Sequence, residues 1–293
     1  MSGWSVSDIP DQQGRTVIVT GANSGLGAVA ARALAGAGAR VVLACRNVDK
    51  GKAVADDIGP LAEVRRLDLA DLSSVREFAD SVDRVDVLIN NAGVMAVPYA
   101  RTADGFEMQI GTNHLGHFAL TGLLLGRISD RIVTVSSDMH NLGVIDLDDL
   151  NWQRRKYRRW QAYGQAKLAN LLFAYELQRK LTAAGWSKLS VAAHPGYAAT
   201  ELQSHTESVQ DIVMALGNRL FAQSAEMGAL PELYAATAEG VEPGGYYGPK
   251  GFRGMRGHPG RVGSSKRSKD QETARGLWEL SEKLTGVRYD FSV

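Results

Sequence analysis

Tyr163 and Lys167 stand four residues apart in a segment rich in helix-forming residues. Residues at this spacing share one face of a helix. A free tyrosine is a poor base near neutrality because its pKa is about 10, and a nearby ammonium favours the phenolate and lowers that pKa. The pair could therefore carry a proton to or from a substrate oxygen, although the same spacing also arises by accident on helix surfaces.

Ser136 and Ser137 stand at the end of an apolar run over residues 132–135. If that run is a parallel strand, the hydroxyls lie at the carboxyl edge of a sheet, where ligands of α/β folds bind. A hydroxyl there can hydrogen-bond a substrate oxygen in the transition state. On the chemistry alone, either serine could fill this role.

A glycine-rich turn, TGANSGLG over residues 20–27, follows the first apolar run. Gly21 permits a tight turn, Gly25 lets the backbone approach a pyrophosphate, and Gly27 lets the next helix lie close to the sheet. The N–H groups at the start of that helix attract phosphate. Any sharp strand–helix corner also uses glycine, so the turn alone is weak evidence. The residues of the turn predicted to bind a dinucleotide are Gly21, Asn23, Ser24, Gly25, Leu26 and Gly27.

Arg46 follows the second apolar run, where an acidic residue would bind the ribose 2′-hydroxyl of NAD. An arginine at this point accommodates the 2′-phosphate of NADP instead, and its planar fork suits a phosphate. Arg46 therefore favours NADP(H) as cofactor. NAD(H) stays possible because Asp49 stands nearby, and a surface arginine without a ligand is the third interpretation.

Short β-branched runs alternate with longer helical patterns through the first two thirds of the chain. The predicted strands cover residues 16–20, 40–44, 64–69, 85–90, 132–136 and 189–193. The predicted helices cover about 26–37, 48–57, 72–82, 104–127 and 160–184. Nearly continuous apolar strands are typical of parallel sheets covered on both faces. The alternation predicts an α/β fold with a Rossmann-type, doubly wound parallel sheet.

The last third of the chain has a different pattern. Residues 197–226 are prone to form helix, 244–263 suggest a strand and loop, and 271–285 form an amphipathic helical pattern. We expect one domain over residues 1–293, with a cofactor and catalytic core over about 14–200. Residues 197–293 are then its substrate loop and C-terminal edge.

The glycine-rich turn, an Asp-Leu pair at 68–69 and an NNAG segment at 90–93 occur in the order and at the intervals of a known family. Together with Tyr163 and Lys167 they resemble the short-chain dehydrogenase/reductase family over nearly the whole chain. The resemblance implies that Asp68 and Leu69 border the adenine. It places the remaining cofactor residues of the sheet, Asn90, Ala92 and Gly93, beside the cofactor.

The resemblance also implies roles at the catalytic end. The active serine is the second of its pair, hence Ser137, and Lys167 anchors the nicotinamide ribose. Asn113 matches a helix asparagine thought to hold a water that links the lysine to solvent. Pro195, Gly196 and Thr200 match an element that contacts the nicotinamide. The predicted catalytic set is thus Asn113, Ser137, Tyr163 and Lys167.

Three further segments resemble one branch of this family in particular. An insertion at 146–152, the ACR sequence at 44–46 and the ending at 274–281 resemble the retinol-dehydrogenase-like branch. The branch does not name a substrate. The chain is therefore expected to be an NADP(H)-dependent oxidoreductase acting on a lipophilic alcohol–carbonyl pair. The alternatives are an NAD-preferring enzyme and a non-catalytic protein that senses the dinucleotide.

Composition limits the partners. The formal net charge of +1 gives no global field for nucleic acid, and the histidines show no spacing typical of metal ligands. The single cysteine, Cys45, lies in an apolar run and is expected to be buried. With no signal peptide and no apolar stretch of membrane-spanning length, a cytoplasmic protein is expected. The family resemblance implies a homodimer or homotetramer.

Two segments stay open. A basic cluster over residues 154–159 could bind an anionic substrate or a lipid surface, or could be a solvated insertion or an oligomer contact. The apolar residues of the segment 209–221 could cover a lipophilic pocket or pack on the core.

Overall fold

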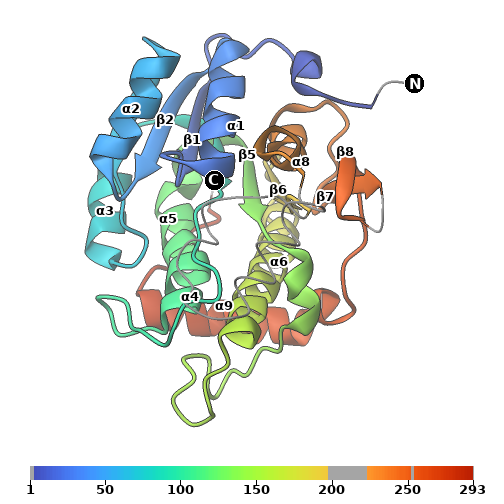
Figure 1. The fold of residues 1–293 in the computed structure, drawn as a ribbon. Helices are drawn as coiled ribbons and strands as arrows, with labels where there is room; N and C mark the ends of the chain where they lie inside the picture. Colours follow the sequence, from blue (N-terminus) through green and yellow to red (C-terminus); the bar gives the residue numbers. More distant parts are fainter. Residues whose placement is uncertain (1–2, 197–222, 252–253, 293) are drawn as a thin grey trace.

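The computed structural model describes residues 3–196, 223–251 and 254–292. Its centre is one eight-stranded sheet in the order β3-β2-β1-β4-β5-β6-β7-β8 (Figure 1). The first seven strands pair in parallel, and β8 is antiparallel to β7. The strands are β1 Thr16–Thr20, β2 Arg40–Cys45, β3 Ala62–Arg66, β4 Val85–Asn90, β5 Ile128–Val135, β6 Leu189–Ala193, β7 Tyr246–Gly251 and β8 Arg256–Arg261.

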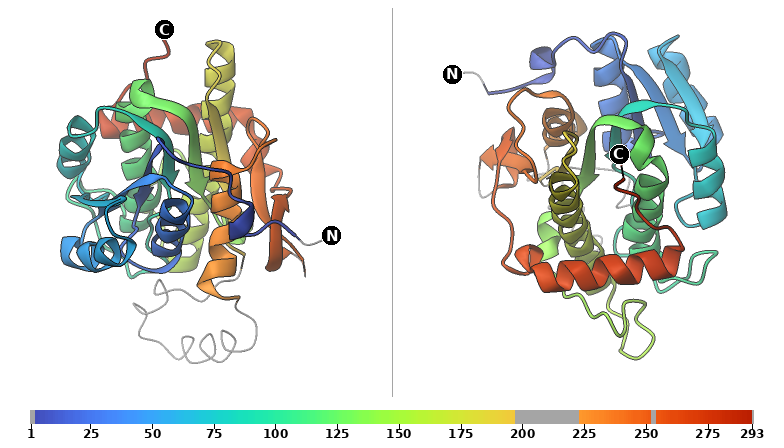
Figure 2. Two further views of the ribbon diagram at one scale, coloured as in Figure 1. Left: turned by 90° about the horizontal axis from the view of Figure 1, so that it is seen from above. Right: turned by 180° about the vertical axis from the view of Figure 1, so that it is seen from behind.

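Helices cover both faces of the sheet. On one face α1, α2 and α8 enclose an apolar cluster, and on the other α3, α5 and α6 enclose a second one. Helix α9 lies across α5 and α6, as Figure 2 shows. The helices are α1 Gly25–Gly36, α2 Val48–Ile58, α3 Leu72–Asp80, α4 Met108–Ile110, α5 Gly116–Leu124, α6 Arg159–Ala183, α8 Ala225–Thr237 and α9 Gln271–Thr285. The shorter helical turns are η1 Val6–Asp8, η2 Gly111–Leu115, η3 Leu125–Arg127, η4 Asp138–Leu142 and η7 Arg267–Lys269.

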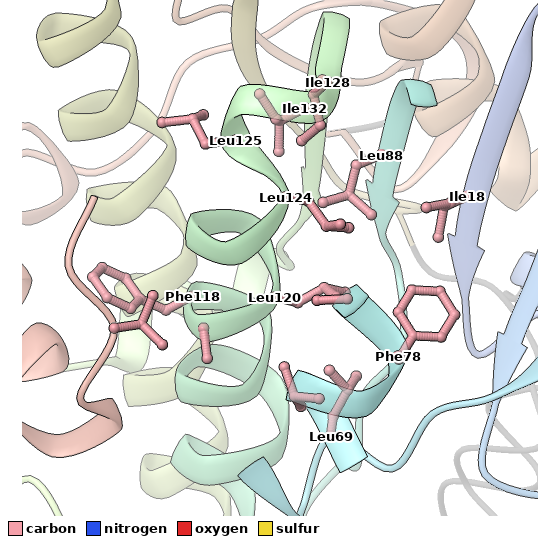
Figure 3. Packing of buried hydrophobic residues seen from close by; sticks show 14 of the residues in the cluster. Ile18, Leu69, Phe78, Leu88, Phe118, Leu120, Leu124, Leu125, Ile128 and Ile132 are labelled. Atoms are coloured by element: carbon pink, nitrogen blue, oxygen red, sulfur yellow. The ribbon is translucent and has the colours of Figure 1, made fainter. Parts of the chain in front are cut away.

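The central strands are buried because apolar side chains leave them on both faces. Ile18, Leu88 and Ile132 pack toward α5, where they meet Leu120 and Leu124 (Figure 3). Their neighbours along the same strands point to the opposite cluster under α1 and α8. This two-sided burial explains why the strands read as continuous apolar runs. The predicted parallel, doubly wound sheet is confirmed.

Some predicted boundaries were wrong. Strand β3 spans Ala62–Arg66 rather than 64–69, and β5 begins at Ile128, four residues before the predicted start. The helix predicted over 104–127 is interrupted by the π-helical turn η2, which holds Asn113. Helix α8 extends well beyond the predicted end at residue 226. The amphipathic helix at the C-terminus matches its predicted range, 271–285.

The C-terminal segment after α9 continues over the α5–α6 side of the molecule. The hydroxyl of Tyr289 donates a hydrogen bond to the carbonyl of Phe118, at 2.7 Å. A Cβ added at Gly122 would lie 2.7 Å from the Tyr289 ring. The segment is therefore packed into the core and closes the outer side of α5.

None of the helices in the described ranges combines the length and apolar character that a membrane span needs. The predicted division of the chain near residue 200 falls among residues that the structure does not describe, so it stays a prediction.

Candidate active site

A cavity of about 550 Å³ opens at the carboxyl edge of the parallel strands. Its walls come from the segments after β1, β2, β3, β4, β5 and β6 and from the N-terminal half of α6. This is the edge at which a doubly wound sheet binds its ligands. The predicted residues that line it are Gly21, Asn23, Ser24, Gly25, Leu26, Gly27, Arg46, Asp68, Leu69, Ala92, Gly93, Ser137, Tyr163, Lys167, Pro195 and Gly196.

Three predicted site residues do not line the cavity as described. Asn90 and Asn113 lie behind its wall, and Thr200 lies outside the described residues, together with the apolar segment 209–221. Asn90 is buried and donates a hydrogen bond to Thr121 of α5, at 2.9 Å. It therefore ties β4 to α5.

The glycine-rich turn has the tight backbone that is predicted at Gly21. Gly21 and Gly25 have φ of 69° and 53°, a conformation that side-chain-bearing residues rarely adopt. A Cβ on Gly27 would lie 2.5 Å from the Asn91 amide and 2.7 Å from the Gly21 carbonyl. Gly27 is thus required by contact with the turn itself and the loop after β4.

Helix α1 begins at this turn without a side-chain cap. Ser24 is the N-cap residue, and its side chain accepts no hydrogen bond from the first turn. The first N–H groups of a helix have no partner within the helix. Left uncapped at the wall of the cavity, they fit the phosphates of a dinucleotide.

Arg46 is exposed at the end of β2 and lines the adenosine end of the cavity, near Asp68. Within the part of the chain that the structure describes, its guanidinium has no hydrogen-bond or ion-pair partner. Asp68 is half-buried, and one of its oxygens accepts from the Ala70 N–H at 3.0 Å. The Arg46 guanidinium and the second carboxylate oxygen of Asp68 are thus available to a ligand.

Asn113 shapes the cavity from behind. Its side-chain oxygen accepts from the Val94 N–H at 2.7 Å, and its amide donates to the Val94 carbonyl at 2.9 Å. A Cβ on Gly93 would lie 3.0 Å from the Asn113 oxygen. The side chain therefore fixes the backbone of the loop that follows β4, and that loop lines the cavity.

The geometry separates the two serines. Ser136 is buried, and its hydroxyl donates to the backbone carbonyl of Lys167 at 2.8 Å. Both serines line the cavity, but the Ser137 side chain is the one that acts on the Tyr163 phenol and favours its ionised form. Only Ser137 is thus placed to share a substrate oxygen with Tyr163.

Burial is the main influence on the pKa of Tyr163. It raises the pKa of the phenol to about 12, and the hydrogen bond with Ser137 opposes this shift only in part. The sequence led us to expect a pKa lowered by Lys167. The Lys167 ammonium instead lies 5.6 Å from the centre of the Tyr163 ring and donates to the Val135 carbonyl at 3.1 Å.

Lys167 is itself buried, which lowers its pKa to about 8, against the attraction of Glu232 on α8. Glu232 was not predicted from the sequence. It is 3% exposed, and neither carboxyl oxygen has a hydrogen-bond partner among the described residues. Burial raises its pKa to about 8, and the Lys167 charge opposes that shift. The available signal was an acidic residue inside the apolar stretch 228–233.

The cavity also has large apolar lining residues that were not anticipated. This apolar wall is formed by Met95, Met108, Met139 and Trp160, which come from four different segments of the chain. The Trp160 ring stands edge-on to the Tyr163 ring, with centroids 6.4 Å apart. Methionine side chains adapt to irregular apolar shapes, so this end of the cavity suits an apolar group attached to the reacting carbon.

At least one residue of the basic cluster 154–159 holds the structure together. Arg155 lies over the Trp152 ring at 3.9 Å and donates to Gln165 at 2.6 Å. It also forms ion pairs with Asp146 and Asp149. Arg155 therefore holds the insertion against α6, whereas Arg154, Lys156 and Arg158 are exposed. Cys45 is buried as predicted, and burial raises the pKa of its thiol to about 11.

His114, buried beside His117, makes a sharp prediction about acid stability. Burial, assisted by the neighbouring His117, lowers its pKa from 6.5 to about 3. Below pH 6.5 the unfolded chain therefore binds a proton that the folded chain refuses, and stability falls with pH. The variant His114→Leu has no such proton to bind, so its stability does not fall for this reason. Its free energy of unfolding in urea should lie below that of the wild type at pH 7.5, and this difference should shrink toward pH 5 by up to about 1.4 kcal/mol per pH unit. A difference independent of pH would contradict the assignment.

Comparison with known proteins agrees with this geometry. The family model of the short chain dehydrogenases matches residues 15–211, more than half of the chain. Human retinol dehydrogenase 13 is 44% identical over 94% of this chain and 85% of its own length. Human retinol dehydrogenase 12 is 42% identical over 94% of this chain and 88% of its own length.

Solved structures share the fold. A crystal structure of an uncharacterised protein from Mycobacterium paratuberculosis is 53% identical, with a TM-score of 0.87 over 99% of this chain and 100% of that one. A protein from Beutenbergia cavernae, described as an NAD(P)-dependent gluconate 5-dehydrogenase and solved with bound NADP at low occupancy, is 28% identical. Its TM-score is 0.61 over 81% of this chain and 96% of that one. The chain belongs to the short-chain dehydrogenase family, as a nicotinamide-dependent oxidoreductase of its retinol-dehydrogenase-like branch.

Proposed function

We propose that the protein is an NADP(H)-dependent oxidoreductase that interconverts a lipophilic alcohol and its carbonyl compound, with Tyr163 as the acid/base. One observation carries the proposal: the Tyr163 and Ser137 side chains interact in the same cavity that holds the uncapped start of α1. A proton-transferring pair and a phosphate-binding turn then serve one bound complex.

Each end of the cofactor has residues of this chain to hold it. The glycine-rich turn and Arg46 would take the phosphates, Asp68 and Leu69 the adenine, and the remaining residues the nicotinamide half. These are Ala92, Gly93, Tyr163, Lys167, Pro195 and Gly196, all of which line the cavity. When bound, the nicotinamide supplies or accepts the hydride.

Tyr163 acts as the proton donor and acceptor. With its pKa raised by burial, the phenol is protonated near neutrality and can donate to a carbonyl oxygen. Ser137 donates a second hydrogen bond to that oxygen as negative charge develops on it. In the reverse direction the phenolate form of Tyr163, which the Lys167 cation and the positive charge of an oxidised nicotinamide would favour, takes the proton of the alcohol. We propose that the cation of Lys167, held at the Val135 carbonyl, anchors the nicotinamide ribose.

The apolar wall supports a lipophilic substrate. Met95, Met108, Met139 and Trp160 offer no charged partner for a substrate carboxylate or phosphate. Relatives named retinol dehydrogenases fit this chemistry, so retinal is one reasonable probe among apolar aldehydes.

Titration of the purified protein with NADPH and NADH, followed by nicotinamide fluorescence, tests the proposal. We expect NADPH to bind at least about tenfold more tightly, since the free Arg46 guanidinium gains a charge-assisted bond to the 2′-phosphate. Preference for NADH would overturn the cofactor assignment alone. Binding of neither cofactor would overturn the proposed enzyme.

A cytoplasmic location and a homodimer or homotetramer stay predictions from the sequence. Cell fractionation and light scattering would test them.

A further inference from the structure

His117 of α5 joins two parts of the site that are far apart in the sequence. One ring nitrogen, Nδ1, lies 3.0 Å from the backbone carbonyl of Asn113. The other, Nε2, lies 2.9 Å from the hydroxyl of Thr20, at the end of β1. The side chain is 1% exposed, so both contacts are shielded from water. Buried polar contacts of this kind are costly to leave unmade.

The surroundings decide which nitrogen carries the proton. A backbone carbonyl only accepts, so the contact with Asn113 requires a proton on Nδ1. The Thr20 oxygen already accepts from the N–H groups of Asn91 and Ala92, at 3.0 and 2.9 Å. Its own proton must therefore be donated. Nε2 of His117, at 2.9 Å, is a closer acceptor than the Ile89 carbonyl, at 3.3 Å.

The two partners of His117 hold the same short loop. Thr20 binds the N–H groups of residues 91 and 92, and Asn113 binds both backbone groups of Val94. Gly93 lies between these anchors, and a Cβ there would stand 3.7 Å from the Lys167 ammonium. Residues 91–95 line the cavity. Their position beside the cofactor and Lys167 thus depends on Thr20 and Asn113.

We propose that His117, neutral and protonated at Nδ1, is a positioning residue that locks both anchors of the loop 91–95 against the bound dinucleotide. The contact between the loop and a bound dinucleotide rests on the proposed function, whereas the role of His117 in holding the loop does not. The same ring cannot be replaced by a simple donor or a simple acceptor, because one anchor needs a donor and the other an acceptor. The charged or titratable groups that act on the pair of buried histidines are Lys167 and, between themselves, His114 and His117.

Two conservative variants each keep one of the two contacts of the His117 ring. In His117→Asn the side-chain amide can occupy the place of Nδ1 and serve Asn113, whereas in His117→Gln the longer side chain can place its carbonyl near Thr20. His117→Leu serves neither. A matched control is His114→Leu, since His114 is equally buried but bonds Ser281 of α9, at 3.0 Å, and not the loop.

The first measurement is amide hydrogen exchange of residues 91–94 by NMR, together with the ring nitrogen shifts of His117. We expect the shifts of an Nδ1–H imidazole in the wild type. In His117→Leu the loop amides should exchange at least about tenfold faster, the effect of one lost hydrogen bond, while His114→Leu leaves them unchanged. The exchange rates of His117→Asn and His117→Gln should fall between those of the wild type and His117→Leu. These two variants replace His117→Leu in the test if that variant does not fold.

The second measurement is the NADPH dissociation constant of the same proteins. It should rise about tenfold in His117→Leu and stay at the wild-type value in His114→Leu. In a Thr20→Val background, His117→Gln should bind NADPH no better than His117→Leu, because the acceptor that Gln restores then has no donor. Unchanged exchange in His117→Leu, or an Nε2–H ring, would overturn the proposal. If the wild type binds no NADPH, the proposed function fails, whereas the exchange result still decides the role of His117.

Discussion

Replacing Tyr163 by Phe is expected to lower kcat/KM by about 10²–10⁴-fold, the usual contribution of a positioned acid/base, while the NADPH dissociation constant stays within about twofold. The phenol lines the cavity beside Ser137 and is placed to reach a substrate oxygen. The phenyl ring fills the same space, so the cofactor and the apolar wall should keep their positions. Steady-state kinetics with an apolar aldehyde and a fluorescence titration give the two quantities.

Tyr175→Phe is the matched control for this experiment. Tyr175 lies on the same helix, and its hydroxyl donates to Ser264 at 2.9 Å, outside the cavity. The control removes the same atom from the same helix and should leave kcat/KM unchanged. Retained turnover in Tyr163→Phe would remove Tyr163 from the mechanism.

The second large effect is expected from Arg46→Asp. Loss of a charge-assisted hydrogen bond, together with repulsion between Asp and the 2′-phosphate, should weaken NADPH binding by about 10–100-fold. NADH, which carries a hydroxyl there, should bind as well as before or better, because an acidic residue at this strand end binds the ribose. Parallel titrations of both cofactors measure the switch.

Arg154→Asp makes the same change of charge at an exposed residue of the basic cluster, outside the cavity. It controls for the altered net charge of the protein and should leave both dissociation constants unchanged at physiological salt. If Arg46→Asp also leaves the ratio of the two affinities unchanged, Arg46 does not select the cofactor.

The central sheet could be predicted because its strands are short, apolar on both faces and separated by helical patterns. The same holds for the glycine-rich turn, where the positive φ of Gly21 and Gly25 leaves few alternatives to glycine. The spacing of Tyr163 and Lys167 likewise predicts that the two side chains share one face of α6. These features are local, so a single stretch of sequence contains their cause.

Features that depend on distant residues could not be predicted. The π-helical turn at Asn113 goes with a hydrogen bond to Val94, nineteen residues earlier in the chain. Ser136 is distinguished from Ser137 by its bond to the Lys167 carbonyl, which depends on how α6 packs against β5. The raised pKa of Tyr163 follows from its burial, which depends on the tertiary packing around it and not on the neighbouring lysine in the sequence. Glu232 approaches Lys167 from α8, and no spacing along the chain connects the two.

Hydride transfer in the cavity is tested most directly by following an isotope from the cofactor to the product. The wild type is incubated with NADPH deuterated at the nicotinamide C4 position and a panel of apolar aldehydes that includes retinal. Each of the two C4 stereoisomers is used in turn, and the mass of the alcohol product is measured by mass spectrometry. We expect one stereoisomer alone to add one deuterium to the alcohol, and Tyr163→Phe to add it about 10²–10⁴-fold more slowly. Tight NADPH binding without deuterium transfer to any aldehyde would contradict the proposed activity and favour a protein that binds the dinucleotide without catalysis.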